Sequence, residues 1–241
     1  AEEAGDRGRV VNMTMNIAVL DHEAGDLGRS LAGYGRVIAD AERLGNRGAL
    51  ARSRNNRGNL LTLIGDHERA EKDLLSALGQ LEEVGNQYLE GNVRCLLAEI
   101  ARKSGEPGAA LTHINHAIAT MSQDDAGAEL LEWQMERSEC LLAAGEGALA
   151  RDAAASVLKR ATSLGNEELQ ARAGWGLARC DLAEPINAEL LTDIDERLVA
   201  CAAAVPESKV VLRVAIDADL AAVKAIRGDT TAAVQLALDS L

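Results

Sequence analysis

The sequence of 241 residues contains no phenylalanine, only 2% aromatic residues and three prolines. A core without phenylalanine has to be built from alanine, leucine, valine and isoleucine packed closely, which favours helix against helix. β-Branched residues never form alternating runs, so the pattern of a β-sheet is missing. The composition therefore predicts an all-α protein.

Positive charge and long apolar runs are also scarce. The formal net charge of −13 argues against a general nucleic-acid surface, which needs clustered lysine and arginine. No apolar run approaches the ~20 residues that span a bilayer, and no signal peptide is visible. Four cysteines without metal-ligand spacing indicate a reducing compartment. We expect a cytoplasmic protein with neither membrane nor nucleic acid as a direct partner.

Glycine, by contrast, recurs in two interleaved series that both have a period of 40 residues. One series comprises Gly25-Asp26, Gly65-Asp66, Gly105-Glu106 and Gly145-Glu146. The other comprises Gly5-Asp6, Gly45-Asn46, Gly85-Asn86 and Gly165-Asn166. Glycine ends a helix in the left-handed conformation without a Cβ penalty, and a following Asp or Asn can cap the next helix.

The segments between these turns predict helices of about five turns each. They lie near residues 7–24, 26–44, 47–64, 67–84, 87–104, 107–122, 127–144, 147–164, 167–183, 186–204, 207–227 and 230–241. The turn at 123–127 departs from the pattern but keeps capping residues. In the fifth hairpin Pro185 replaces the turn glycine, while Leu190 and Arg197 replace small residues, so a looser crossing is expected there. The sixth hairpin follows after 43 residues rather than 40, with its turn at Gly228-Asp229.

The stretch from 55 to 86 carries small residues where two paired helices would cross, namely Gly58, Gly65, Ala70 and Ala77. This spacing resembles the tetratricopeptide repeat (TPR), whose usual period is about 34 residues. The resemblance implies an α-solenoid of about six hairpins in a right-handed superhelix. A single array over 1–241 would contain hairpins near 7–44, 47–84, 87–122, 127–164, 167–204 and 207–241.

The lengthened repeats are similar to those of bacterial multidomain regulators of the MalT and AfsR type. Residues 1–6 match the end of a second helix, and the last segment stops within an apolar helical pattern. Solenoids normally have polar caps on their terminal repeats. We therefore expect the chain to be a fragment of a longer protein.

In TPR arrays four positions of each first helix face the concave groove, and the resemblance assigns them here. The predicted peptide-binding residues are Arg52, Asn55, Asn59, Asn92, Glu99, Arg102, Met135, Glu139, Arg172, Trp175 and Arg179. The same assignment places Asn12, Met15, Val19, His22, Thr62, Cys95, Glu132, Leu142 and Leu182 at the groove. Asparagine amides suit a peptide backbone, and tryptophan and arginine are frequent hot-spot residues. Trp175 between two arginines is the preferred anchor, although it could instead pack against the neighbouring helix.

No catalytic or metal constellation is apparent in the sequence. His113 and His116 share a helix face without a third ligand at helical spacing. Cys140 and Cys180 occupy the same slot of successive repeats, which predicts small buried positions. Glu132, Glu136 and Glu139 form a stripe that is expected to be solvent-exposed. The prediction is that the chain is not an enzyme and has no cofactor or metal.

The predicted function is recognition of a protein or peptide by the concave face, as the sensory or scaffold segment of a larger signalling or transcriptional regulator. Three alternatives stay open. The module could sense a small molecule, it could form homo-oligomers, or it could regulate a protease, kinase or ATPase domain that lies outside this sequence.

Overall fold

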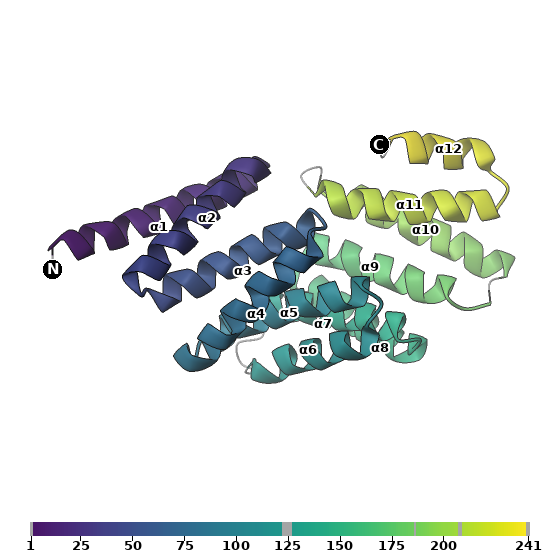
Figure 1. Cartoon of the computed structure of the whole chain (residues 1–241). Coiled ribbons are helices and arrows are strands. Elements are labelled where there is room, and N and C mark those ends of the chain that lie inside the picture. The colour runs from purple at the N-terminus through teal and green to yellow at the C-terminus, as the bar shows by residue number, and fades with distance from the viewer. Residues whose placement is uncertain (1, 122–126, 186, 207–208, 240–241) are drawn as a thin grey trace. The chain divides into compact units, whose positions relative to one another are not determined.

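The computed structural model describes residues 2–121, 127–185, 187–206 and 209–239, and these contain twelve helices and no strand (Figure 1). The first six helices are α1 (Glu2–Glu23), α2 (Leu27–Leu44), α3 (Arg47–Leu63), α4 (His67–Val84), α5 (Gln87–Lys103) and α6 (Pro107–Thr120). The others are α7 (Ala128–Ala143), α8 (Gly147–Leu164), α9 (Glu167–Leu182), α10 (Ala188–Ala204), α11 (Val210–Ile226) and α12 (Thr230–Asp239). The predicted all-α fold of about six hairpins is confirmed.

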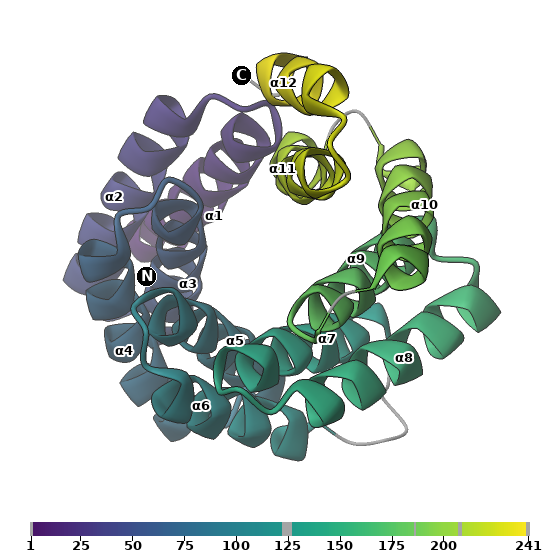
Figure 2. The ribbon, with the colours of Figure 1, turned by 90° about the vertical axis from the view of Figure 1, so that its right-hand side faces the viewer.

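The helices form two compact units that divide between Gln123 and Asp124. Unit 1 contains α1 to α6 and unit 2 contains α7 to α12. Within each unit the first helices of the hairpins lie on one side and the second helices on the other (Figure 2). We call the former the first-helix layer, which is α1, α3 and α5 in unit 1 and α7, α9 and α11 in unit 2. The right-handed superhelix and the single array over 1–241 stay predictions.

Glycine ends the helices as the sequence predicts. The amide of Gly25 donates to the carbonyl of His22 at 2.9 Å, and the amide of Asp26 donates to the carbonyl of Asp21 at 2.8 Å. This pair of bonds is a Schellman motif, and it requires the positive φ of 79° found at Gly25. The glycines with positive φ are Gly25, Gly45, Gly65, Gly85, Gly105, Gly145, Gly165 and Gly228.

Asp and Asn cap the following helices, whereas Glu does not. The Oδ1 atoms of Asp26 and Asn46 accept hydrogen bonds from backbone amides three residues later, at 3.2 and 3.0 Å. Glu106 and Glu146 stand at the same place and make no capping bond through their side chains. The glutamate side chain has one more methylene, which moves its carboxylate out of the capping geometry.

Three predicted boundaries require comment. The prediction of a turn at Gly5-Asp6 is wrong, because α1 continues from Glu2 to Glu23 without a break. The turn at 123–127 falls mostly on residues outside the described part of the chain. Helix α10 begins at Ala188 rather than directly after Pro185, since the side chain of Asn187 caps the amide of Leu190 at 2.8 Å.

Small residues bring the paired helices together. Ala70 and Ala77 are fully buried, and a Cβ on Gly58 would lie 2.7 Å from Leu74. In the fifth hairpin the buried set shifts to Leu191, Ile194, Leu198 and Cys201. As expected for a looser crossing, α9 and α10 contact each other over fewer residues than the paired helices of the first four hairpins, although a Cβ on Gly174 would lie 2.8 Å from the sulfur of Cys201.

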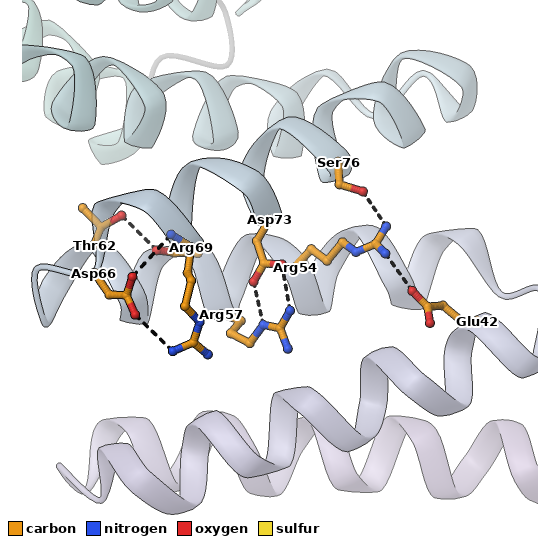
Figure 3. Close-up of polar contacts among 9 residues, drawn as sticks. Glu42, Arg54, Arg57, Thr62, Asp66, Arg69, Asp73 and Ser76 are labelled. Atoms are coloured by element: carbon orange, nitrogen blue, oxygen red, sulfur yellow. Dashed lines mark hydrogen bonds and ion pairs between the residues drawn. The ribbon is translucent and has the colours of Figure 1, made fainter.

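Arginines link successive hairpins of unit 1 at a repeated position. Arg54 of α3 donates to Glu42 of α2 at 2.7 Å and to Ser76 of α4 at 2.6 Å (Figure 3). Forty residues later, Arg94 of α5 contacts Glu82 of α4 at 3.2 Å. The end of each of these second helices is therefore tied to the first helix that follows it.

Gly33 and Gly79 form a matched pair for testing how closely the helices must pack. A Cβ on Gly33 would lie 2.7 Å from the Cβ of Ala18, whereas nothing lies within 4 Å of a Cβ on Gly79. Gly33→Ala should lower the free energy of unfolding by ~1–3 kcal/mol, because the contact involves stiff atoms near the backbone. Gly79→Ala should raise it by up to ~1 kcal/mol through helix propensity. Urea unfolding followed by circular dichroism measures both, and equal effects would contradict the packing argument.

Candidate functional site

The first-helix layer of unit 1 contains six of the predicted groove residues. Arg52 and Asn59 are exposed on α3, and Asn92 of α5 is half-buried. Glu99 and Arg102 are also half-buried on α5, and Glu99 accepts a hydrogen bond from Lys103 at 2.6 Å. Asn55, by contrast, has only 8% of its surface exposed. The exposed and half-buried members are available to a ligand, whereas Asn55 is not at the open surface.

Asn55 belongs to a register whose side chains face the next first helix rather than solvent. The sulfur of Met15, 40 residues earlier, lies 3.9 Å from Nδ2 of Asn56 on α3. Met135, in the same register, packs against Gly176 of α9, where no side chain intervenes. Trp175 donates from Nε1 to Oδ2 of Asp219 on α11 at 2.7 Å.

The prediction of an open position in the groove is wrong for two residues of this register. Met135 is wholly buried and Asn55 nearly so, because both fill the space between neighbouring first helices. Trp175 is half-buried for the same reason and packs against the core of unit 2, as the alternative interpretation of this residue anticipated. Asp219 was not identified from the sequence, since the sixth hairpin lies 43 rather than 40 residues after the fifth.

Acids of α7 pair with arginines of α9 across the first-helix layer of unit 2. Arg172 pairs with Glu132, and its Nη2 lies 3.9 Å from Glu136. Arg179 pairs with Glu139, and the guanidinium stands 5.1 Å from the centre of the Trp175 ring. The pairs of Arg172 with Glu132 and of Arg179 with Glu139 each join residues that are 40 apart in the sequence.

The acidic stripe of α7 is therefore not the solvent-exposed face that the sequence analysis expected. Glu136 is 3% exposed and Glu139 is 7% exposed. A buried carboxylate needs a partner, and the arginines of α9 supply it. Glu139 is consequently a paired residue of the layer rather than an open contact for a ligand.

Asn55 has an unusual feature in this context. Its Nδ2 donates to Oδ1 of Asn56 at 3.2 Å, while its own Oδ1 is buried without a hydrogen-bond partner among the described residues. An unsatisfied buried acceptor costs free energy, so such atoms are uncommon in native proteins. The amides of Asn55 and Asn56 thus form an incompletely bonded polar group beside the exposed Arg52 and Asn59.

One histidine of α6, His116, lies near a carboxylate of another helix, which helical spacing within α6 could not reveal. Nε2 of His116 lies 3.6 Å from Oε1 of Glu90 on α5. Burial, followed by the charge of Arg94, lowers the pKa of His113 below its usual 6.5. In the part of the chain that the structure describes, no three His, Cys, Asp or Glu side chains are grouped to hold a metal ion. Within the same residues no helix is long and apolar enough to cross a membrane.

Cys140 and Cys180 are buried, as their shared slot in the repeat predicted. Burial raises the pKa of Cys180, and the nearby carboxylate of Glu139 acts in the same direction. Burial also raises the pKa of Cys201. Since the thiolate is the nucleophile, these environments favour unreactive thiols.

The pair of Arg179 and Glu139 allows a direct test of the ion pairs in unit 2. Arg179→Met should lower the free energy of unfolding by ~1–3 kcal/mol, because it leaves the buried Glu139 carboxylate without its partner. Adding Glu139→Gln should recover most of that loss, and a double-mutant cycle gives the coupling. Arg29→Met serves as the control, since the side chain of Arg29 is 70% exposed and its pair should contribute under ~1 kcal/mol. Additive effects of the two changes would contradict the pairing.

The thiols can be ranked by their rates of reaction with a disulfide reagent. Cys95 is half-buried, so it should react first, while Cys180 and Cys201 should react much more slowly because burial raises the pKa of each. Mass spectrometry of the labelled chain at neutral pH measures the order. Cys95→Ser should remove the fast phase, and persistence of that phase would contradict the ranking.

Comparison with known proteins gives one matching family model and several solved structures with a similar architecture. A tetratricopeptide repeat family model matches residues 50–123. No curated protein matches the chain. The apo form of RapI superposes with a TM-score of 0.76 at 11% identity, covering 95% of this chain and 82% of that one. A Rap protein in complex with competence and sporulation factor gives 0.70 at 13% identity, with coverage of 96% and 77%.

A third structure, a putative kinesin light chain of Podosopora anserina with TPR-like repeats, has a TM-score of 0.61 at 14% identity. It covers 80% of this chain and 94% of its own. The TM-scores show that the three proteins share the fold of this chain, and at such low sequence identities they show no more than the fold. The repeat spacing, the paired helices and the family match at residues 50–123 agree, so the chain has the fold of a TPR-like α-solenoid.

Proposed function

We propose that the first-helix layer of unit 1 binds a peptide segment of a partner protein. The observation that carries this proposal is the group of amides and cations on α3 and α5. Arg52 and Asn59 are exposed, Asn56 and Asn92 are half-buried, and Oδ1 of Asn55 lies beside them without a partner among the described residues. Amides can both donate to and accept from an extended backbone, so such a row suits main-chain recognition.

Unit 1 is a better candidate than unit 2 on grounds of charge. In unit 2 the arginines of α9 are paired with the acids of α7, so a ligand would have to replace these contacts. In unit 1 the row is mostly uncharged and half-open, which lowers the cost of removing water from it. Arg172, Trp175 and Arg179 of the predicted groove lie on α9 of unit 2, and we treat them as a separate, weaker candidate surface of that unit.

The structural neighbours support a binding role for such a layer. One of them, the Rap protein, is in complex with competence and sporulation factor. By analogy, a chain of this fold presents a surface that accommodates another molecule. We infer further that the chain acts in the cytoplasm as the sensory or scaffold segment of a larger bacterial regulator of signalling or transcription. The motivation for this context is the expected resemblance of the lengthened repeats to those of MalT and AfsR, and the full-length reading frame tests it.

The peptide-binding proposal can be tested with a displayed library of short linear peptides. Peptides selected on the intact chain should bind Arg52→Ala and Asn59→Ala variants about tenfold more weakly, which corresponds to ~1.4 kcal/mol. Lys72→Ala is the matched control, because Lys72 is exposed on α4, the second helix of its hairpin, and so lies outside the first-helix layer. Selection of peptides whose affinity depends on Lys72 but not on Arg52 or Asn59 would overturn the assignment.

A further inference from the structure

A hollow of about 360 Å³ lies within unit 1, where the C-terminal ends of α2 and α4 meet the first turns of α3. Ala41 of α2 and Leu50 of α3 line it with apolar side chains, and both are buried. The other side chains that line it are polar, namely Glu42, Arg47, Gln80 and Glu83. The hollow therefore combines an apolar surface with a few polar groups, as sites for small ligands do.

One of these polar groups, the side-chain amide of Gln80, is incompletely bonded. Its Oε1 is buried and has no hydrogen-bond donor among the described residues. A buried acceptor in this state costs free energy unless water or a ligand supplies a donor. Because Gln80 lines the hollow, a rotation of its side chain is enough to bring this oxygen to a donor bound there.

The charges around the hollow favour a cation. Two carboxylates, those of Glu42 and Glu83, line it against the single guanidinium of Arg47. Helices α2 and α4 both end at the hollow, and the C-terminal end of a helix dipole is negative. Helix α3 begins there and opposes them with its positive end, but Asn46 already caps that end. The balance of charges and dipoles is negative.

Both carboxylates have partners that leave room for a ligand. Glu83 pairs with Arg47, and these side chains are 58% and 66% exposed. Exposed ion pairs contribute little to stability, so a ligand cation can replace Arg47 at small cost. Arg54 binds Oε1 of Glu42 at 2.7 Å and leaves the second oxygen, Oε2, as a further acceptor (Figure 3).

The next hairpin does not repeat this combination of groups. Forty residues after Leu50 stands Glu90, whose carboxylate accepts a hydrogen bond from Arg94 at 2.9 Å. Forty residues after Gln80 stands Thr120, whose hydroxyl donates to a backbone carbonyl of α6 at 2.7 Å. An unpartnered amide oxygen beside an apolar wall is therefore a property of this hollow rather than of the repeat.

We propose that the hollow binds an organic cation with a short aliphatic stem, that is, an alkylammonium or alkylguanidinium group. The stem lies against Ala41 and Leu50, and its N–H donors reach Oε1 of Gln80 and the carboxylate of Glu83. A free amine or guanidine has this chemistry, and so does a lysine or arginine side chain of a partner protein. The hollow contains no residue of the proposed peptide-binding layer, so the two proposals are independent.

The probe is n-butylguanidinium, titrated into the isotope-labelled intact chain and followed by NMR. We expect a dissociation constant of about 1 mM or below, with shifts of the side-chain signals of Gln80 and Arg47. The anion n-butyrate also has a short aliphatic stem but the opposite charge, and it should not bind.

Variants of Gln80 test the role of the unpartnered oxygen. Gln80→Leu should weaken binding of n-butylguanidinium about fivefold, because it removes an acceptor, and Gln80→Glu should strengthen it by adding a negative charge. Gln87→Leu is the matched control, since Gln87 is an exposed amide in the first turn of α5 and should not affect binding. Circular dichroism checks that the variants keep their helix content.

A capped peptide with one arginine, acetyl-Gly-Arg-Gly-amide, distinguishes the two sources of the cation. Binding as tight as that of n-butylguanidinium assigns the hollow to a side chain of a partner, whereas binding of n-butylguanidinium alone assigns it to a free small molecule. The proposal is overturned if n-butylguanidinium does not bind, if n-butyrate binds equally well, or if Gln80→Leu leaves the affinity unchanged. Arg52→Ala with Asn59→Ala should not change this affinity, which separates the outcome from that of the peptide-binding proposal.

Discussion

The length of each helix, fixed by a glycine in the left-handed conformation, is the constraint on which the other contacts depend. Because the turns recur every 40 residues, a side chain on one first helix meets nearly the same position of the next. The pairs Arg172 with Glu132 and Arg179 with Glu139 exist only because this spacing is kept between α7 and α9. A change in the length of one helix would therefore disturb lateral contacts over a whole layer.

The two units use this common geometry for different chemistry. The first-helix layer of unit 1 contains amides and one unpartnered acceptor, Oδ1 of Asn55, among the described residues. That of unit 2 contains buried carboxylates such as Glu139 that are neutralised by arginines. Interactions between buried charges are strong but costly to rearrange, whereas amides exchange water for a ligand more easily. The first-helix layer of unit 2 is thus joined by ion pairs, whereas that of unit 1 presents a row of amides.

The sequence predicted the helices and turns well because these depend on local chemistry. Glycine and the capping residue at Gly25-Asp26 act within a few residues of each other, and the structure confirms that turn. The burial of Cys140 and Cys180 also followed from their shared slot. The turn at Gly5 was wrong, because glycine permits a helix to end but does not force it to do so.

The groove residues were harder to predict, because they depend on how neighbouring first helices are rotated against each other. Met135 was expected at an open surface, yet the close approach at Gly176 encloses it. The contact of Trp175 with Asp219 joins helices whose spacing departs from the common period. Pairwise geometry between helices is set by packing over the whole layer, and a single sequence does not contain it explicitly.

The three additional residues before the sixth hairpin have a consequence for how such chains change in evolution. Asp219 lies 43 residues after Gly176, and it still meets the helix before it through Trp175. The extra length is taken up between the end of α10 at Ala204 and the start of α11 at Val210, so the facing helix surfaces are preserved. Insertions and deletions can accumulate at such connections without loss of the lateral contacts. Homologous arrays should therefore be aligned hairpin by hairpin, with gaps placed between hairpins rather than within them.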